Sequence, residues 1–382
     1  MPVDSSSLDN TACPVGNARC YCTNRNLSMY SENRTNCRSY YVCSETEAMY
    51  VHCRDNLSPL PSHSPLPPTP PPVPAEDKPA YSYGVYVDSR GDPWVGEAAD
   101  SKLGKFPKYV THLFLAFMQP DTTYTGGVTF EGTGLRFASD ATVVKDAIVL
   151  LKKKNPHTKV LISVGGFMYN NWNDLNATAI ANFVYTFGLD GVDIGYEPMR
   201  SNCKLVDSTT QCETDWEYTY AIKALRAAMP RPYILANAAM NVGAYGEGKW
   251  ADAQPTASDR FRAISIPPLR KLGHELDALL LVAYDAGETF DPKEAFTAYS
   301  SYFEGDVLVG VQVPPESWGG HEVTLLEIDN LTVFLRHRNA AGMFLFDAFR
   351  RGPHKALTAN QISKRICMNL GLDDCETPLV SW

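Results

Sequence analysis

Short apolar runs recur along the chain from residue 81 onward, separated by longer segments of mixed polarity. Most successive runs begin roughly 30 to 50 residues apart, which leaves room for a helix and two loops between them. Near-continuous apolar runs are typical of parallel strands that are buried on both faces. We recognise eight such runs, at residues 83–88, 110–118, 159–164, 191–197, 233–240, 278–285, 307–313 and 342–346.

Between these runs, residues 143–151 and 214–228 have the spacing of amphipathic helices. Strand and helix alternate in this way in an α/β fold of the (β/α)8 TIM barrel type, which needs about 250 residues. An open, doubly wound sheet is the alternative, but the sequence shows neither a GxGxxG nor a phosphate-binding loop. We therefore expect a barrel over residues 81–382.

The pattern before residue 81 is different. Residues 57–80 contain ten of the 27 prolines and predict an extended, semi-rigid spacer. Residues 1–56 are polar and rich in cysteine, and so short a segment cannot fold on an apolar core alone. They predict a small disulfide-rich domain, since no CxxC pair supports the alternative of a metal site.

All ten cysteines are disulfide candidates. Cys203 and Cys212 are close in sequence, as are Cys367 and Cys375, so each pair could close a local loop. The other six are Cys13, Cys20, Cys22, Cys37, Cys43 and Cys53. Disulfides and five N-x-S/T sequons favour a secreted glycoprotein. Against secretion, Met1 is followed by polar residues and no signal peptide is visible.

Charge narrows the possible partners. The chain has 34 Lys+Arg against 43 Asp+Glu, a formal charge of −9, which argues against a nucleic-acid binder. No apolar run is long enough to span a membrane.

The eight histidines are scattered without an HxH or HxxxH pair, so we expect no metal. We also expect no cofactor and a monomer.

The run 191–197 carries the clearest chemical signal. In a barrel of this type, catalytic residues lie at the C-terminal ends of the strands. Strand alternation places Asp193, Gly195 and Glu197 on the same face. Carboxylates on the inward face of an apolar strand are costly unless they are hydrogen-bonded or used in chemistry. A barrel-core ion pair is the alternative, but the strand offers no neighbouring Lys or Arg.

Three motifs carry a family resemblance. Residues 189–198, Leu-Asp-Gly-Val-Asp-Ile-Gly-Tyr-Glu-Pro, resemble the DGxDxDxE signature of family 18 glycoside hydrolases, the chitinases and their relatives. Residues 163–166, Ser-Val-Gly-Gly, resemble the SxGG motif of that family, and Tyr284-Asp285 resembles the end of its MxYD motif. The resemblance covers roughly residues 81–352 and implies a barrel that acts on chitin.

The resemblance also implies roles for single residues. Glu197 would be the general acid, and the 2-acetamido oxygen of the substrate would be the nucleophile, which gives retention of configuration. Asp193 would be the carboxylate that supports Glu197, and it would be hydrogen-bonded towards Ser163. Tyr284 would contact the acetamido group, and Asp285 would hold the sugar.

Five further residues are candidates for substrate binding. Gly166 belongs to the SxGG motif, and Phe346 stands where the family has a tryptophan that forms the floor of the site. Tyr86 and Phe117 lie on the first two predicted strands, and Trp318 lies in a glycine-rich loop. For Tyr86, Phe117 and Trp318, packing in the core is an equal alternative.

Gly195 is the main departure from the family pattern, which has its central Asp there. The loss of a preorganised group of this kind typically lowers the rate by about 10² to 10³. Without that carboxylate we also expect Glu197 to ionise more readily. Val282 replaces the Met of the MxYD motif.

The N-terminal segment has a partial resemblance of its own. The spacing Cys22-x14-Cys37-x5-Cys43-x9-Cys53, with Tyr40 and Tyr41, resembles the first four cysteines of a peritrophin-type chitin-binding module. Tyr40, Tyr41 and Tyr50 either stack on sugar rings or fill the small core. Six cysteines allow 15 pairings, so the connectivity stays open.

The leading hypothesis is a secreted chitinase-like hydrolase with weakened activity on chitin or β-1,4-linked N-acetylglucosamine oligosaccharides. The alternative is a non-catalytic chitin-binding lectin on a degenerate hydrolase barrel.

Overall fold

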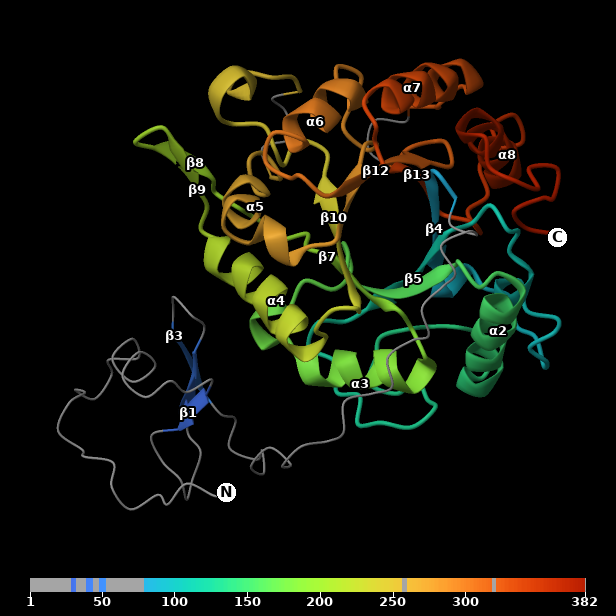
Figure 1. Cartoon of the computed structure of the whole chain (residues 1–382), viewed down its shortest axis with the longest axis horizontal. Helices are drawn as coiled ribbons and strands as arrows, with labels where there is room; N and C mark the ends of the chain where they lie inside the picture. The colour runs from blue at the N-terminus through green and yellow to red at the C-terminus, as the bar shows by residue number, and fades with distance from the viewer. Residues whose placement is uncertain are drawn as a thin grey trace. The chain divides into compact units, whose positions relative to one another are not determined.

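The computed structural model describes residues 79–255, 260–317 and 321–381, together with three short strands nearer the N-terminus (Figure 1). The chain divides into two compact units, Met1–Pro68 and Thr69–Trp382. In the smaller unit, β1 (Met29–Ser31), β2 (Ser39–Cys43) and β3 (Ala48–His52) form an antiparallel sheet.

Two of the predicted sugar-stacking residues, Tyr40 and Tyr41, lie on β2, and Tyr50 lies on β3 opposite Tyr41. Only the backbone of these strands is described. The predicted disulfide partners Cys13, Cys20, Cys22, Cys37 and Cys53 lie outside the described residues, as does the side chain of Cys43. A disulfide-rich domain at this end of the chain therefore stays a prediction.

The larger unit is a closed barrel of eight parallel strands (Figure 1). Each strand pairs with its neighbours in chain order, and β13 closes the ring by pairing with β4. The strands are β4 (Ser82–Asp88), β5 (His112–Met118), β6 (Lys159–Gly165), β7 (Gly191–Gly195), β10 (Ile234–Met240), β11 (Ala278–Val282), β12 (Asp306–Gln312) and β13 (Gly342–Phe346). Each of the eight predicted apolar runs overlaps one of these strands, so the barrel prediction is confirmed.

Helices follow seven of the eight strands. They are α2 (Ala141–Lys154), α3 (Ala177–Phe187), α4 (Asp215–Ala228), α5 (Ile266–Leu272), α6 (Pro292–Tyr299), α7 (Leu325–His337) and α8 (Ala359–Leu370). Between β4 and β5 the chain forms only 3-10 turns, at Ser89–Gly91 and Leu103–Lys105. The first unit of the barrel thus lacks the α-helix that the alternation predicts.

The core has two layers. One apolar cluster fills the space between the strands and the surrounding helices. A smaller cluster fills the inside of the barrel and includes Tyr86, Phe114, Tyr284 and Phe344. Because the barrel interior is packed with side chains rather than hollow, any chemistry must take place at its rim.

The two local disulfides predicted from sequence are present. Cys203–Cys212 closes the loop that carries the antiparallel hairpin of β8 (Lys204–Val206) and β9 (Thr209–Gln211). Cys367–Cys375 joins the end of α8 to the C-terminal segment. No helix in the described part of the chain could cross a membrane.

Candidate active site

Strand β7 is anchored at its start by the buried Asp190. Its carboxylate accepts a hydrogen bond from Val160 N–H at 2.7 Å and pairs with Lys152 Nζ at 2.6 Å. These bonds tie β7 to β6 and to α2. The first acid of the 189–198 motif is therefore structural, and it fixes the strand whose other end carries Asp193, Gly195 and, two residues later, Glu197.

Asp193 is fully buried on the inward face of β7. Its Oδ2 accepts hydrogen bonds from Tyr86 Oη at 2.8 Å and from Ser163 Oγ at 2.6 Å. These donors come from the first and third barrel strands, so the carboxyl joins three strands. Burial raises the pKa of Asp193 to about 6, although both hydroxyl donors act to lower it.

Glu197 lies just past the end of β7 and keeps partial exposure to solvent. Burial raises its pKa to about 7, Arg260 acts to lower it, and the charges of Asp285 and Asp193 act to raise it. Our expectation that Glu197 ionises more readily than it would with an acid at position 195 compares two chains and stays a prediction. In this chain desolvation is the largest influence on Glu197, so its carboxyl is protonated to a large extent near neutral pH.

Tyr284 and Asp285 follow β11 on the same rim. The buried Tyr284 ring stacks on Phe346 with 5.9 Å between centroids, and burial raises the pKa of its hydroxyl well above the usual value. Asp285 has a positive φ of 55°, so the chain turns sharply here and β11 ends at Val282, earlier than the predicted run. Gln312 Nε2 lies 3.3 Å from Asp285 Oδ2.

Aromatic rings line the space beside these acids. Tyr86 lies 6.4 Å from Phe117 and 5.6 Å from Phe346, measured between ring centroids. Phe117 and Phe346 keep partial exposure, whereas Tyr86 is buried in the barrel interior. The structure therefore brings all three together, with Tyr86 acting as both packing residue and donor to Asp193. Trp318 lies outside the described residues.

Four polar residues near the site were missed by the sequence analysis. Asn241 Nδ2 donates to the Tyr284 carbonyl oxygen at 3.1 Å, and the Glu316 carboxylate accepts the Asp285 N–H at 2.5 Å. Gln312 and Arg260 complete the set. Each follows or ends a barrel strand without a motif around it, so only the fold shows that they belong to the site.

A family model for glycosyl hydrolases family 18 matches residues 83–319. The chain belongs to glycosyl hydrolases family 18. None of the curated protein sequences compared with it matches significantly. Among solved structures, this family 18 barrel is similar to three with TM-scores of 0.51 to 0.52, which at such low sequence identity shows a shared fold.

The first is a GH18 chitinase from Pseudoalteromonas aurantia, at 18% identity, with 75% of this chain and 99% of that chain covered. The second is human YKL-39, described as a pseudo-chitinase with retained chitooligosaccharide binding, at 11% identity and 76% and 100% coverage. The third is a family 18 N-acetylglucosaminidase from Paenibacillus barengoltzii, at 14% identity and 76% and 99% coverage.

Gly195 is packed tightly in this family 18 barrel. A Cβ built on it would lie 3.0 Å from Gly166 N and 3.2 Å from Val164 O. A Cβ on Gly165 would lie 2.4 Å from Gly195 O, and one on Gly166 would lie 2.9 Å from Phe117 Cδ1. Gly165 thus lets the ends of β6 and β7 approach each other, and Gly166 leaves room for the Phe117 ring of β5. Gly166 N donates to Gly195 O at 2.7 Å.

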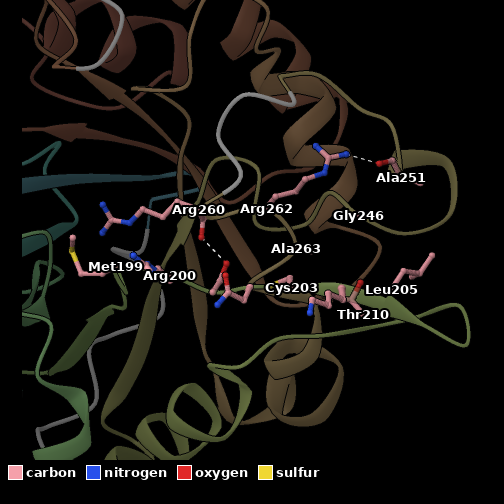
Figure 2. Close-up of a pocket in the computed structure, with 13 residues that line it drawn as sticks. Met199, Arg200, Cys203, Leu205, Thr210, Gly246, Ala251, Arg260, Arg262 and Ala263 are labelled. Carbon is pink, nitrogen blue, oxygen red and sulfur yellow. Dashed lines mark hydrogen bonds between the residues drawn. The ribbon is translucent and has the colours of Figure 1, made fainter.

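A groove of about 700 Å³ begins at Met199, two residues after Glu197 (Figure 2). It is lined by residues 199–205 and by Thr210, Gly246, Ala251, Arg260, Arg262 and Ala263. Arg260 connects the groove to Glu197, because it lines the groove and donates hydrogen bonds to the carbonyl oxygens of Glu197 and Pro198. Within the described ranges, no three His, Cys, Asp or Glu residues are grouped so that they could hold a metal ion.

Proposed function

We propose that this barrel binds chains of β-1,4-linked N-acetylglucosamine and hydrolyses them slowly, with retention of configuration. The observation that carries the proposal is the Glu197 carboxyl, which has a pKa of about 7 and keeps partial exposure at the rim. A general acid works best when its pKa lies near the working pH, because it must hold a proton and still release it.

The proposed reaction uses the sugar's own acetamido group. Glu197 protonates the glycosidic oxygen as the bond to C1 breaks, and the acetamido oxygen attacks C1 to give a cyclic oxazolinium ion. Glu197, now ionised, then takes a proton from the water that opens this ring. Family 18 is among the substrate-assisted exceptions to the two-carboxylate rule, so no second carboxylate has to attack the sugar.

Asp193 and Tyr284 are the proposed supporting residues. Asp193 is fixed by Tyr86 and Ser163 at 2.8 and 2.6 Å, which holds a carboxyl of raised pKa beneath the acid. Tyr284 has its carbonyl oxygen held by Asn241 and its ring held by Phe346. Prepositioned groups of this kind stabilise charge as it develops in the transition state.

Binding without hydrolysis is the second candidate. Gly195 places no side chain where an acid could orient the acetamido group, and Phe346 offers a smaller stacking face than tryptophan would. Human YKL-39, which shares the fold, is itself described as a pseudo-chitinase that retains chitooligosaccharide binding. The two candidates share the binding step and differ only in turnover.

One set of variants separates the two candidates. We would measure release of a fluorescent leaving group from a short chitooligosaccharide, and binding of chitotetraose by calorimetry, for the native protein, Glu197→Gln, Gly195→Asp and Gly195→Ala. For the enzyme we expect slow release that Glu197→Gln abolishes while binding persists. Gly195→Asp should accelerate release by about tenfold or more, since a single such group contributes up to about 10² to 10³.

Gly195→Ala is the matched control for the close contact at Gly166 N, because it adds the Cβ without the carboxylate. Binding with no release in the native protein would favour the lectin. If neither binding nor release is detected, both candidates are wrong.

The proposal extends to the whole chain. We propose that residues 1–56 form a chitin-binding module, that residues 57–80 are its linker to the barrel at 81–382, and that the protein is secreted. The two disulfides support this, because such bonds persist in oxidising compartments.

A further inference from the structure

We infer that Arg260 is the positioning residue for Glu197: its guanidinium fixes the main chain of the acid and places a permanent positive charge beside it. This inference rests on the proposed function, in which Glu197 is the general acid. Arg260 is 63 residues away from Glu197 in sequence, in the segment after β10, and belongs to none of the three motifs.

Three hydrogen bonds connect this arginine to the segment after β7. Its Nε donates to Pro198 O at 2.7 Å, and its Nη2 donates to Glu197 O at 3.1 Å. In return, Ser201 Oγ donates to the carbonyl oxygen of Arg260 at 2.7 Å. The planar guanidinium suits two acceptors at once, which a lysine ammonium cannot hold with the same fixed geometry.

Aromatic rings hold the guanidinium in place. It lies 4.6 Å from the centroid of the Phe261 ring and 5.7 Å from that of Phe167. Phe167 follows the SxGG motif at the end of β6, so the arginine contacts the segments that follow β6 and β7. A side chain held by two carbonyl groups and two rings has little rotamer freedom left, which is what a positioning role requires.

The charges around Glu197 make the sign of the effect definite. Asp193 on β7 and Asp285 after β11 both act to raise its pKa, and Arg260 acts to lower it. The charge of Glu197 also acts to raise the pKa of two hydroxyl groups, those of Tyr86 on β4 and Tyr284 after β11. Removing the guanidinium charge leaves desolvation and two acids to act together, so the pKa of Glu197 must rise.

Arg262 provides a matched control. It lies in the same segment with similar burial, donates to the carbonyl oxygens of Ala251 and Ala253, and stacks 5.9 Å from the Tyr245 ring centroid. Figure 2 shows its side chain pointing towards Ala251, whereas that of Arg260 points the opposite way. Arg262→Gln therefore removes the same type of charge and the same type of bond without touching Glu197.

The first experiment titrates Glu197 in the full chain by NMR of carboxyl-labelled glutamate, with the signal assigned by its loss in Glu197→Gln. We expect Arg260→Gln to raise the pKa of Glu197 by about one pH unit. Arg260→Lys keeps the charge and should leave it near the native value, as should Arg262→Gln. An unchanged pKa in Arg260→Gln, or an equal rise in Arg262→Gln, would overturn the inference.

The titration needs no sugar, so its result stands apart from whether the barrel is an enzyme. The second readout is turnover or, for a lectin, chitotetraose affinity. Arg260→Lys should lower it at least about tenfold, since it keeps the charge but loses the two-point hold on the backbone. If Arg260→Gln does not fold, Arg260→Lys decides: native turnover and affinity in that variant would also overturn the inference.

Discussion

Four carboxyl groups at the rim of the barrel retain their protons to unusually high pH. Burial raises the pKa of Asp193 and Asp347 to about 6, and that of Glu197 and Glu316 to about 7. Each group therefore binds protons more tightly in the folded chain than in the unfolded one. The stabilising protonated form is fully present at low pH and is lost as the pH rises through the folded pKa values.

At the residue scale, Glu197→Gln should change stability in a pH-dependent way. Its pKa moves from an ordinary 4.5 to about 7 on folding, so ionisation at pH 8 opposes folding, whereas at pH 4 the group is neutral in both states. The free energy of unfolding of Glu197→Gln, taken relative to that of the native protein, should therefore be about 1–3 kcal/mol higher at pH 8 than at pH 4. Urea unfolding at both pH values measures this.

Glu131→Gln, an exposed site, serves as its control. If the difference in free energy of unfolding between the native protein and Glu197→Gln is the same at pH 4 and pH 8, folding does not raise the pKa of Glu197. The proposal that Glu197 is the general acid would then lose its physical basis.

At the element scale, the close approach of β6 and β7 depends on Gly165. It has φ of +97°, and a Cβ there would lie 2.4 Å from both Gly195 O and Trp172 Cζ2. Gly165→Ala should therefore lower the free energy of unfolding by more than about 3 kcal/mol. Gly126 has φ of +117°, and no atom lies within 4 Å of a Cβ built on it, so Gly126→Ala should lower the free energy of unfolding by only about 1–2 kcal/mol. Equal losses in denaturant titrations would contradict this reading of the motif.

The elements were largely predictable because a buried parallel strand must be apolar along its whole length. Local chemistry decides where each strand ends, and there the predictions were weaker, as at Asp285 with its positive φ. The acids Asp193 and Glu197 were predictable because they interrupt an apolar run. Arg260 and Glu316 were not, since each reaches the site through a loop contact with a distant part of the chain. The pKa of Glu197 required knowledge of burial, which no motif supplies.

At the scale of the whole molecule, the barrel closes on itself through the β13–β4 pairing, using only residues of the larger unit. A fragment of residues 79–382 should therefore fold alone, with the thermal midpoint and chitotetraose affinity of the full chain. Retention on insoluble chitin powder should fall by about tenfold or more, because linked modules raise the effective concentration of each site. Unchanged retention would remove the chitin-binding role proposed for residues 1–56.

The β8–β9 hairpin projects from the barrel as a two-stranded ribbon (Figure 1). Its side chains Leu205 and Val206 are 57% and 41% exposed. A ribbon of this kind is marginal alone, and apolar strand edges readily pair with other chains. The Cys203–Cys212 disulfide joins the two ends of the hairpin. A reducing environment would therefore loosen the hairpin and favour self-association of the protein. We therefore expect the solubility of the protein to depend on redox conditions through a disulfide whose Cys203 also lines the groove.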